Sequence, residues 1–337
     1  MKDKRIFVTG GTGYLGSYLL RYLVQRGYRN ELALRRPNSS SQLVGPIREQ
    51  VQWIEGDILD VGFLEEVLLE VDLVYHCAGM VSYHPRHTER MIEINEMGTA
   101  NVVNVLLHHG KGRLLHVSSI AAIGRSKENR HISESSKWVR SPLTSYYAIS
   151  KFLAEQQVWR GIAEGLDAVI INPSIIIGSG FWERGSARFF PRIEKGQRFY
   201  PLGSSGFVDV RDVARLAIEL MESDISAERF IANGANLSYK KFFQIIAQSL
   251  GVAPPRTAAG PWLSGIAWRV EALRSWLTGS KPFLTKQNAL LAGVHFPYDN
   301  QKSVDTLGFK YFPIEETLSA TAEQYRQSSS ERILPLL

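Results

Sequence analysis

Cysteine is nearly absent from this chain, which has Cys77 as its one cysteine among 337 residues. An internal disulfide is therefore impossible, as expected for a protein of a reducing compartment. No apolar run approaches the ~18 residues that a membrane-spanning helix needs. The first residues lead directly into an apolar strand pattern, so we expect no signal peptide. We therefore expect a cytoplasmic protein without a membrane span.

Long runs of one charge are also missing. The 39 basic and 33 acidic residues give a net charge of +6, and no basic run extends beyond Arg35 and Arg36. Scattered charge of this kind argues against a nucleic-acid interface, and we predict no metal site. A mildly positive balance suits an anionic cofactor or an anionic substrate equally well.

The first half of the chain alternates short apolar runs with helical patterns. The runs lack regular polar alternation, which is typical of strands buried on both faces of a parallel sheet. Strands that alternate with helices in this way indicate a doubly wound α/β fold of the Rossmann type. The predicted strands are residues 5–9, 31–34, 51–55, 73–78, 113–119 and 168–172, and the predicted helices are Tyr14–Arg26, Phe63–Leu69, Glu89–His109 and Tyr147–Glu164.

The pattern changes after Asn172. The following residues are rich in loops and aromatics, residues 207–222 return to a strand followed by a helix, and helical patterns dominate from Asn233. The predicted domains are a nucleotide-binding Rossmann domain (residues 1–172 plus about 206–232) and a smaller, mostly helical substrate-binding lobe (residues 173–205 plus about 233–330).

A glycine-rich turn follows the first predicted strand, where residues 9–16 read TGGTGYLG. Glycine tolerates the positive φ of a tight turn, and a pyrophosphate can approach bare backbone N–H groups at the start of the next helix. The last glycine, Gly16, lets helix and strand pack closely. This turn predicts a dinucleotide site with contacts from Gly10, Gly13, Tyr14 and Leu15.

No acidic residue follows the second predicted strand, where an NAD-binding protein usually holds the adenosine ribose with Asp or Glu. The chain has Arg35 and Arg36 there. Guanidinium groups bind phosphate through parallel hydrogen bonds, so we predict NADP, with Arg35 favoured for the 2′-phosphate. Two solvated surface arginines are the alternative, and NAD then stays possible.

The third predicted strand ends in EGDILD, residues 55–60. Asp57 could accept a hydrogen bond from the adenine amino group, could cap the next helix, or could do both. Ile58 would pack on the adenine ring. Both residues therefore join the predicted cofactor site.

Tyr147 and Lys151 stand four residues apart in SYYAISK, residues 145–151, and share one face of a helix. A free phenol has a pKa of about 10 and is a poor base at neutral pH, whereas a nearby ammonium lowers that pKa. Tyr147 could then exchange a proton with a substrate oxygen during hydride transfer, and Lys151 could hydrogen-bond the nicotinamide ribose. Tyr146 is offset by about 100° and should face elsewhere.

A serine pair ends the fifth predicted strand, in the segment HVSSIAAIG. Open α/β sheets place their active sites at this carboxyl edge. Alternation along the strand turns Ser118 and Ser119 to different faces, and Ser119 is nearer the loop. We therefore choose Ser119 as the hydroxyl that contacts the substrate oxygen.

These motifs together resemble the extended short-chain dehydrogenase/reductases, within the NAD-dependent epimerase/dehydratase superfamily. The chain has TGGTGYLG, GDILD, CAG, NEMGTAN, VSSIAAIG, YAISK and NPSIIIG in that family's order. The later segments FVDVRDVA and YDNQKSVDTLGFKYFPIEETL extend the likeness to nearly the whole chain. The site residues that the resemblance implies are Ser119, Tyr147 and Lys151 for catalysis, Ala78 and Gly79 beside the adenosine ribose, and Pro173 and Ser174 beside the nicotinamide.

Three further residues are assigned less directly. By the resemblance, Asn95 would prop the active-site helix or hold a water relay, although a helix cap or a buried hydrogen bond explains an asparagine there equally well. His76 is expected to be a satisfied core histidine. Cys77 is expected to be a small buried filler.

Two differences from the sugar-nucleotide enzymes of this family indicate to which branch the chain is similar. Arg35 replaces their usual aspartate, and no acid follows Ser119 in IAAIGR. With GSKPFLTKQN and YDNQKS, the chain looks more like the dihydroflavonol-reductase and 3β-hydroxysteroid-dehydrogenase branch, whose members interconvert ketones or aldehydes with alcohols. We therefore expect an NADP-dependent oxidoreductase for a small, hydrophobic substrate. A sugar-nucleotide epimerase or dehydratase is the first alternative, and a non-catalytic nucleotide-sensing protein is the second.

The lobe also contains an aromatic cluster that could form an apolar ligand wall or the core of the lobe. The aromatic residues are Phe181, Trp182, Phe189, Phe190, Phe199 and Tyr200.

Family relatives pair through the helices predicted at 89–109 and 147–164, so a homodimer is expected.

Residues 261–279, PWLSGIAWRVEALRSWLTG, have apolar residues at helical spacing, with Arg269 and Arg274 off that stripe. A lobe helix that packs beside the substrate cleft is the favoured interpretation. A helix that lies in a membrane interface and delivers a lipid-like substrate is the alternative. The stripe consists of Trp262, Ile266, Val270, Leu273 and Leu277.

Overall fold

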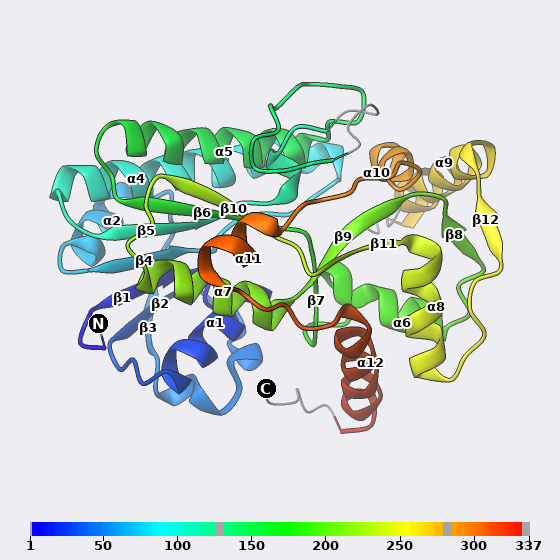
Figure 1. The fold of residues 1–337 in the computed structure, drawn as a ribbon, viewed down its shortest axis with the longest axis horizontal. Coiled ribbons are helices and arrows are strands. Elements are labelled where there is room, and N and C mark those ends of the chain that lie inside the picture. The colour runs from blue at the N-terminus through cyan, green and yellow to red at the C-terminus, as the bar shows by residue number, and fades with distance from the viewer. Residues whose placement is uncertain (1, 126–130, 279–284, 332–337) are drawn as a thin grey trace.

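The computed structural model describes residues 2–125, 131–278 and 285–331. Its central sheet consists of β1 (Ile6–Thr9), β2 (Glu31–Arg35), β3 (Gln52–Glu55), β4 (Leu73–His76), β5 (Arg113–Val117), β6 (Ala168–Pro173) and β10 (Glu228–Ala232). The strands lie in the order β10-β6-β5-β4-β1-β2-β3, and paired neighbours run parallel (Figure 1). The doubly wound parallel sheet expected from the apolar runs is confirmed.

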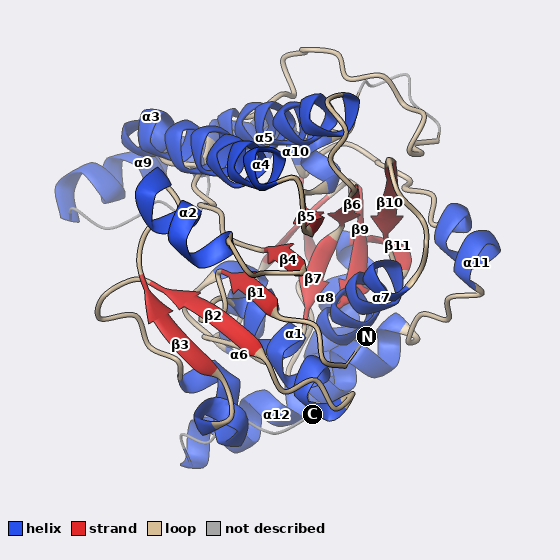
Figure 2. Cartoon of the chain, turned by 90° about the vertical axis from the view of Figure 1, so that its left-hand side faces the viewer, coloured by secondary structure: helices blue, strands red, loops and turns tan. Residues whose placement is uncertain are grey.

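Helices cover both faces of this sheet, as Figure 2 shows. One layer contains α2 (Val61–Leu68), α4 (Gly98–His109) and α5 (Tyr146–Ala163), and the other contains α1 (Tyr14–Gln25) and α7 (Val210–Glu222). Each layer forms its own apolar core against the sheet. The inner strands are therefore covered on both sides, which explains why their sequences lack polar alternation.

The helix predicted at Glu89–His109 consists of three segments. α3 (Thr88–Ile92) leads into a π-helical turn at Glu93–Met97, and α4 continues from there. Single π-helical turns inside helices frequently occur at functional sites. This turn contains Asn95, whose exposed fraction is 2%.

The remaining elements form a smaller lobe and the C-terminal segment. They are β7 (Ile175–Ile177), α6 (Phe189–Glu194), β8 (Phe199–Pro201), β9 (Ser204–Asp209), β11 (Ala235–Ser238), α8 (Tyr239–Leu250), β12 (Thr257–Ala259), α9 (Pro261–Thr278), α10 (Lys286–Leu291), α11 (Gln301–Leu307) and α12 (Ile314–Glu331). Two small sheets have the orders β11-β9-β7 and β12-β8. The strand and the helix predicted at 207–222 belong to different parts of the molecule. The strand, β9, pairs with β7 and β11 in the lobe, whereas the helix, α7, packs on the large sheet.

The aromatic residues of the lobe pack mainly in its core. Phe190 is fully buried, and Trp182, Phe189 and Tyr200 pack against the same apolar cluster. Phe199 is an exception, with an exposed fraction of 41%. These four residues therefore form part of the core of the lobe. They do not form a wall that contacts a ligand.

The apolar stripe that was predicted to pack on the lobe faces outward in α9. Trp262 is 81% exposed and Leu277 is 68% exposed, and the main neighbours of the helix are α10 and β12. The predicted helix is therefore confirmed over Pro261–Thr278, packing of its apolar stripe on the lobe is wrong, and its place beside a substrate cleft stays a prediction. Gly279, the last residue of the predicted helix, and the rest of 279–284 lie outside the described residues. Across the described ranges, no helix is long and apolar enough to cross a membrane.

Candidate active site

The glycine turn between β1 and α1 lies against the end of β4. Gly10 has a φ of +71°, and a Cβ there would lie 2.8 Å from the backbone nitrogen of Ala78. A Cβ on Gly16 would lie 2.3 Å from the carbonyl oxygen of Gly10. Both approaches need glycine. The turn therefore holds two strand ends and the start of α1 close enough to contact one ligand.

The start of α1 offers uncapped backbone N–H groups. Gly13 is the N-cap residue and supplies no side-chain hydrogen bond, which leaves the first turn available to an anion. The Tyr14 ring packs on the backbone at Gly178 and Gly180, where a Cβ on Gly180 would lie 2.9 Å from it. Tyr14 and Leu15 thus pack against the apolar core, and their backbone N–H groups are the parts suited to a pyrophosphate.

Arg35 and Arg36, at the end of β2, differ in their surroundings. Arg35 pairs with Glu55 on the neighbouring strand β3 at 2.7 Å. Arg36 is exposed, and within the described ranges no ion pair links it to a carboxylate. Glu55 was not singled out from the sequence, and it competes with any phosphate for Arg35.

Asp57 and Ile58 occupy the turn after β3. The Asp57 carboxylate accepts a hydrogen bond from the Leu59 N–H at 3.0 Å, whereas Asp60 is the residue that caps α2. The helix-capping role considered for Asp57 is therefore wrong. Ile58 is 5% exposed and packs under Gly98 of α4, so its side chain supports the helix beside this edge of the sheet.

Asn95 connects the turn after β4 to α5. Its amide nitrogen donates to the Met80 carbonyl (3.0 Å) and to the Ser150 hydroxyl (2.9 Å), and its oxygen accepts from the Met80 N–H (2.7 Å). A Cβ on Gly79 would lie 3.3 Å from the Asn95 oxygen and 4.0 Å from the Lys151 nitrogen. These contacts support the interpretation of Asn95 as a prop for α5, and they bring Gly79 next to Lys151.

α5 follows Ser145, whose hydroxyl caps the helix by accepting from the Ala148 N–H at 3.0 Å. Tyr146 points outward and is 46% exposed, in agreement with its offset from the predicted face. Tyr147 faces inward, and its ring centre lies 5.8 Å from that of Tyr83. Of the two neighbouring tyrosines, Tyr147 is the one that reaches the carboxyl edge of the sheet.

The pKa of the Tyr147 phenol lies above its ordinary value. Burial raises it, while a hydrogen bond with Ser119 and the positive charge of Arg125 act in the opposite direction. We expected Lys151 to lower this pKa, but its ammonium donates to the Val117 carbonyl instead, at 2.8 Å. In this arrangement the prediction is wrong, because burial outweighs the lowering effects and the charge that acts on the phenol comes from Arg125.

Lys151 itself is buried between α5 and β5, with an exposed fraction of 5%. Burial lowers the Lys151 pKa to about 8, although the negative charge of Glu155 acts to raise it. Loss of a proton at this pH would remove an ammonium from the site. The charge of Lys151 is therefore sensitive to pH near neutrality.

A buried carboxylate, Glu155, lies on the inward face of α5 and is 1% exposed. It accepts hydrogen bonds from Ser118 Oγ (2.6 Å) and Asn172 Nδ2 (2.7 Å), and it pairs with Arg229 of β10 at 2.9 Å. Asn172 Nδ2 also donates to the Ser119 carbonyl at 3.0 Å. This network joins β6, β10 and the segment after β5 to α5. The sequence reasoning missed it, because its members are far apart in the chain.

The two serines after β5 have different partners. Ser118 is buried and its hydroxyl is bonded to Glu155. The Ser119 hydroxyl accepts from the Ala121 N–H at 3.1 Å, and it acts to lower the pKa of Tyr147. Ser119 is therefore the serine whose hydroxyl can contact a substrate oxygen beside the phenol.

Pro173 and Ser174 lie where β6 meets β10. The Ser174 N–H donates to the Ala232 carbonyl at 2.9 Å. The Ser174 hydroxyl is buried, and in the described part of the chain it has no hydrogen-bond partner. Leaving a buried hydroxyl unpaired is costly, so this oxygen is suited to a polar group of a ligand.

His76 and Cys77 end β4 beneath the glycine turn. The two ring nitrogens of His76 lie 2.8 Å from the Thr9 hydroxyl and 3.0 Å from the Thr99 hydroxyl. Burial, assisted by the charge of Lys151, lowers the His76 pKa to about 3, so it is a neutral core histidine as expected. Cys77 is only partly buried, and burial raises the pKa of its thiol to about 12.

Arg125 was not singled out from the sequence as a site residue. Its guanidinium carbon lies 5.4 Å from the ring centre of Phe296 and 5.6 Å from that of Tyr298, and among the described residues its Nε has no hydrogen-bond partner. Burial raises the pKa of Tyr83 and Tyr239, and the charge of Arg125 opposes that rise. Arg125 and Tyr83 therefore lie beside the inward phenol of α5.

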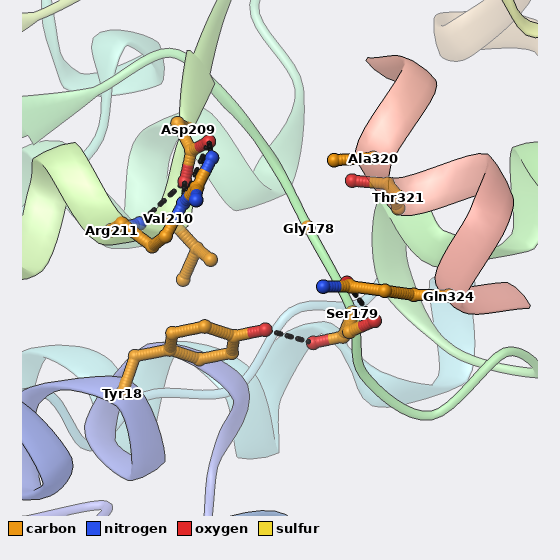
Figure 3. A pocket seen from close by; sticks show the side chains of 9 residues that line it. All are labelled: Tyr18, Gly178, Ser179, Asp209, Val210, Arg211, Ala320, Thr321 and Gln324. Carbon is orange, nitrogen blue, oxygen red and sulfur yellow. Dashed lines mark hydrogen bonds and ion pairs between the residues drawn. The ribbon is translucent and has the colours of Figure 1, made fainter. Parts of the chain in front are cut away.

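A small cavity lies apart from these residues, between α1, the start of α7 and α12 (Figure 3). Its volume is about 40 Å³, and the Tyr18 hydroxyl donates to the Ser179 carbonyl at its edge, at 3.0 Å. The predicted site residues do not line it. A cavity of this size is a packing void rather than a nucleotide site.

Similarity to known proteins identifies the family of the chain. The family described as NAD dependent epimerase/dehydratase family matches residues 6–231. A Synechocystis sp. protein provisionally named dihydroflavonol 4-reductase is 28% identical over 325 residues, which cover 93% of this chain and 92% of that one. Sterol demethylase protein B of Methylococcus capsulatus is 30% identical over 267 residues, or 77% of this chain and 79% of that one.

Solved structures share the fold. The crystal structure of gox2253 matches with a TM-score of 0.81 and 26% identity, over 96% of this chain and 98% of that one. DesIV, a dTDP-glucose 4,6-dehydratase from Streptomyces venezuelae, matches with a TM-score of 0.77 and 21% identity, over 98% and 99%. The family supports a nicotinamide cofactor. The chain belongs to the NAD-dependent epimerase/dehydratase family and is an NAD(P)-dependent oxidoreductase of the extended short-chain dehydrogenase/reductase type.

Proposed function

We propose that the chain interconverts a ketone or an aldehyde with the corresponding alcohol, using NADP and Tyr147 as the acid or base. One observation carries the proposal. The Ser119 hydroxyl lies close enough to the Tyr147 phenol to lower its pKa, and both groups lie at the carboxyl edge of the sheet, where such folds hold their ligands. Lys151 and Gly79 lie together at the same edge.

The residues at this edge fit a dinucleotide. Gly10 leaves no room for a Cβ, the start of α1 is uncapped, and within the described ranges the buried Ser174 hydroxyl has no partner. When bound, the cofactor supplies the hydride. The residues that would hold it are Gly10, Gly13, Tyr14 and Leu15 at the pyrophosphate, Asp57, Ile58, Ala78 and Gly79 at the adenosine, Lys151 at the nicotinamide ribose, and Pro173 and Ser174 at the nicotinamide.

The protonation state of the phenol suits proton donation to a carbonyl. Because burial raises the Tyr147 pKa, the phenol holds its proton at neutral pH and can donate it to a carbonyl oxygen. Ser119 would donate to the same oxygen. Lys151 would leave the Val117 carbonyl and turn toward the ribose and the phenol, stabilising the phenolate after proton transfer.

NADP is favoured over NAD by the two arginines that follow β2. The pairing of Arg35 with Glu55 reduces the charge that Arg35 can offer, whereas Arg36 is exposed. We therefore assign the main contact with the 2′-phosphate to Arg36, with Arg35 as a second donor. A phosphate binds guanidinium through parallel hydrogen bonds, so either contact would disfavour NAD.

The substrate is proposed to be a small carbonyl compound with an apolar body. The rings of Tyr83, Tyr239 and Tyr298 would contact that body, and Arg125 would contact an oxygen on it. The same residues would give a sugar nucleotide few of the acidic partners that sugar hydroxyls use. A homodimer through α4 and α5 and a cytoplasmic location stay predictions.

The test is oxidation of NADPH by the purified chain with a panel of aromatic, steroidal and aliphatic carbonyl compounds. We expect turnover with at least one class, and turnover about 10² to 10⁴-fold lower with Tyr147→Phe. Conversion of UDP-sugars or dTDP-sugars without net NADPH oxidation would instead support the epimerase or dehydratase alternative. Tight nucleotide binding with no turnover in either assay would support the nucleotide-sensing alternative.

A further inference from the structure

α9 is turned with its apolar face to the outside. Its outward side chains, spaced by four, four, three and four residues, fall on one face of the helix. The polar Ser264, Glu271 and Ser275 lie on the opposite face and are partly covered. The exposed fractions along the stripe are 81% for Trp262, 41% for Ile266, 61% for Val270, 57% for Leu273 and 68% for Leu277.

The helix lies at one end of the molecule. In Figure 1 it stands beside α10 and β12, at the opposite end from β1, β2 and β3. The neighbouring α10 exposes a further apolar residue, Leu290, at 47%. An apolar face of this kind on the outside of a protein marks an interaction site, and its place at the end of the molecule suits a broad, flat partner.

Basic side chains border the stripe. At about 100° per residue, Arg269 and Arg274 fall on its two sides. The Arg269 guanidinium lies 4.7 Å from the ring centre of Trp268, and Arg274 pairs with Glu271 at 2.7 Å. Residues 239–300 contain seven lysines and arginines and two acidic residues, so this part of the chain attracts anions.

We infer that α9 docks the protein on a membrane surface that contains anionic lipids, with the apolar stripe among the headgroups and Arg269 and Arg274 near their phosphates. Helices with an apolar face bordered by basic residues lie in this interface. Tryptophan is enriched at the same depth, and Trp262 is the most exposed residue of the stripe. Docking does not depend on the proposed reaction, so the two proposals can fail separately.

A second copy of the chain fits this face less well. A two-fold interface sets each surface against itself, so Arg269 and Arg274 of the two copies would face each other. Glu271 is already paired with Arg274 in its own helix, and its side chain is 19% exposed. The charges therefore favour an anionic surface over self-association.

The test is sedimentation of the full chain with vesicles of phosphatidylcholine alone and of phosphatidylcholine mixed with phosphatidylglycerol. We expect binding to the mixed vesicles, weakened more than about tenfold by the double variant Ile266→Glu/Leu273→Glu. Arg269→Gln should weaken it about fivefold, on the mixed vesicles only. Leu69→Glu is the matched control, because Leu69 is 55% exposed and lies at the end of α2, and it should bind like the wild type.

Two further measurements separate docking from misfolding and from self-association. Each variant must keep its nucleotide affinity, and quenching of fluorescence by brominated lipid should be smaller in Trp262→Phe than in the wild type. Absence of binding to either vesicle, or equal binding by all variants, would overturn the proposal. Self-association in ultracentrifugation that the double variant abolishes, without vesicle binding, would identify a second copy as the partner and overturn it as well.

Discussion

α5 and α9 are both helices of 18 residues, yet α5 buries polar side chains against the sheet while α9 exposes its apolar face. α5 buries Ser150, Lys151 and Glu155, because its neighbours on the sheet offer hydrogen bonds and an ion pair. α9 exposes Leu273 and Leu277, because α10 and β12 cover only its other side. The difference shows that the elements around a helix, and not its hydropathy pattern alone, determine which face is buried.

The largest expected effect is a loss of turnover when Tyr147, on the inward face of α5, is changed. Tyr147→Phe keeps the ring but removes the proton donor, so turnover should fall about 10² to 10⁴-fold, while nucleotide affinity stays near that of the wild type. Steady-state kinetics with a substrate from the carbonyl panel measure the first quantity, and fluorescence titration with NADPH measures the second.

The outward neighbour supplies the control for this variant. Tyr146→Phe should leave turnover nearly unchanged, because Tyr146 is exposed. Near-normal turnover in Tyr147→Phe, or a loss confined to Tyr146→Phe, would mean that α5 presents the other tyrosine to the substrate.

The buried network of α5 should be worth far more to stability than an exposed pair on the same helix. Glu155→Ala leaves Arg229 and three other donors without their acceptor, so the free energy of unfolding should fall by about 3 kcal/mol. Glu164→Ala removes an exposed partner of Arg160 and should cost less than about 1 kcal/mol. Urea unfolding of both variants makes the comparison, and equal losses would refute it.

Cofactor choice should depend on the arginines after β2. Wild type should bind NADPH about tenfold or more tightly than NADH, and Arg36→Ala should lose most of that difference. Glu55→Gln should strengthen NADPH binding, because it releases Arg35 from its ion pair. Isothermal titration gives the ratio of NADPH affinity to NADH affinity for the wild type, Arg36→Ala and Glu55→Gln. Equal affinities for the two nucleotides in the wild type would exclude NADP specificity.

The smallest effect is a pH dependence set by Lys151. Its pKa of about 8 means that its charge is lost as pH rises through that value, so NADPH affinity should decline there. Glu155→Gln removes a charge that raises this pKa, and the decline should then begin at lower pH. In Lys151→Met the decline should be absent.

Unfolding does not explain this decline. The folded pKa of Lys151 lies below the ordinary value of 10.5, so between about pH 8 and 10.5 the unfolded chain binds the proton more readily. The contribution of Lys151 to the free energy of unfolding therefore increases with pH across that window. A parallel loss of folded protein and NADPH affinity near pH 8 would contradict the assignment.

Much of the fold could be predicted from the sequence, because the inner strands are buried on both faces and their apolar runs show it. The π-helical turn at Glu93–Met97 could not, since it depends on how α3 and α4 pack. The division of 207–222 between lobe and sheet could not either, because strand pairing joins segments that are distant in the chain. The outward stripe of α9 had a clear helical period, but a period does not say which side is covered.

The site was predictable where its chemistry is local. The glycine turn and the four-residue spacing of Tyr147 and Lys151 are visible in short windows, and the turn and this spacing appear in the structure as expected. Glu155 and Arg125 were missed, because their partners come from other strands and from the lobe. Lys151 was expected to act on the phenol, but its length allows it to reach the Val117 carbonyl instead.

The claim that α5 carries a hydride-transfer site is tested most directly by isotope transfer. The wild type is incubated with a reactive carbonyl compound and NADPH that carries deuterium at the transferred position, and the product is examined by mass spectrometry. The wild type should form an alcohol with one deuterium in proportion to the NADPH consumed, and Tyr147→Phe should form almost none. An unlabelled alcohol, product formed without NADPH consumption, or equal labelling by Tyr147→Phe would contradict the claim.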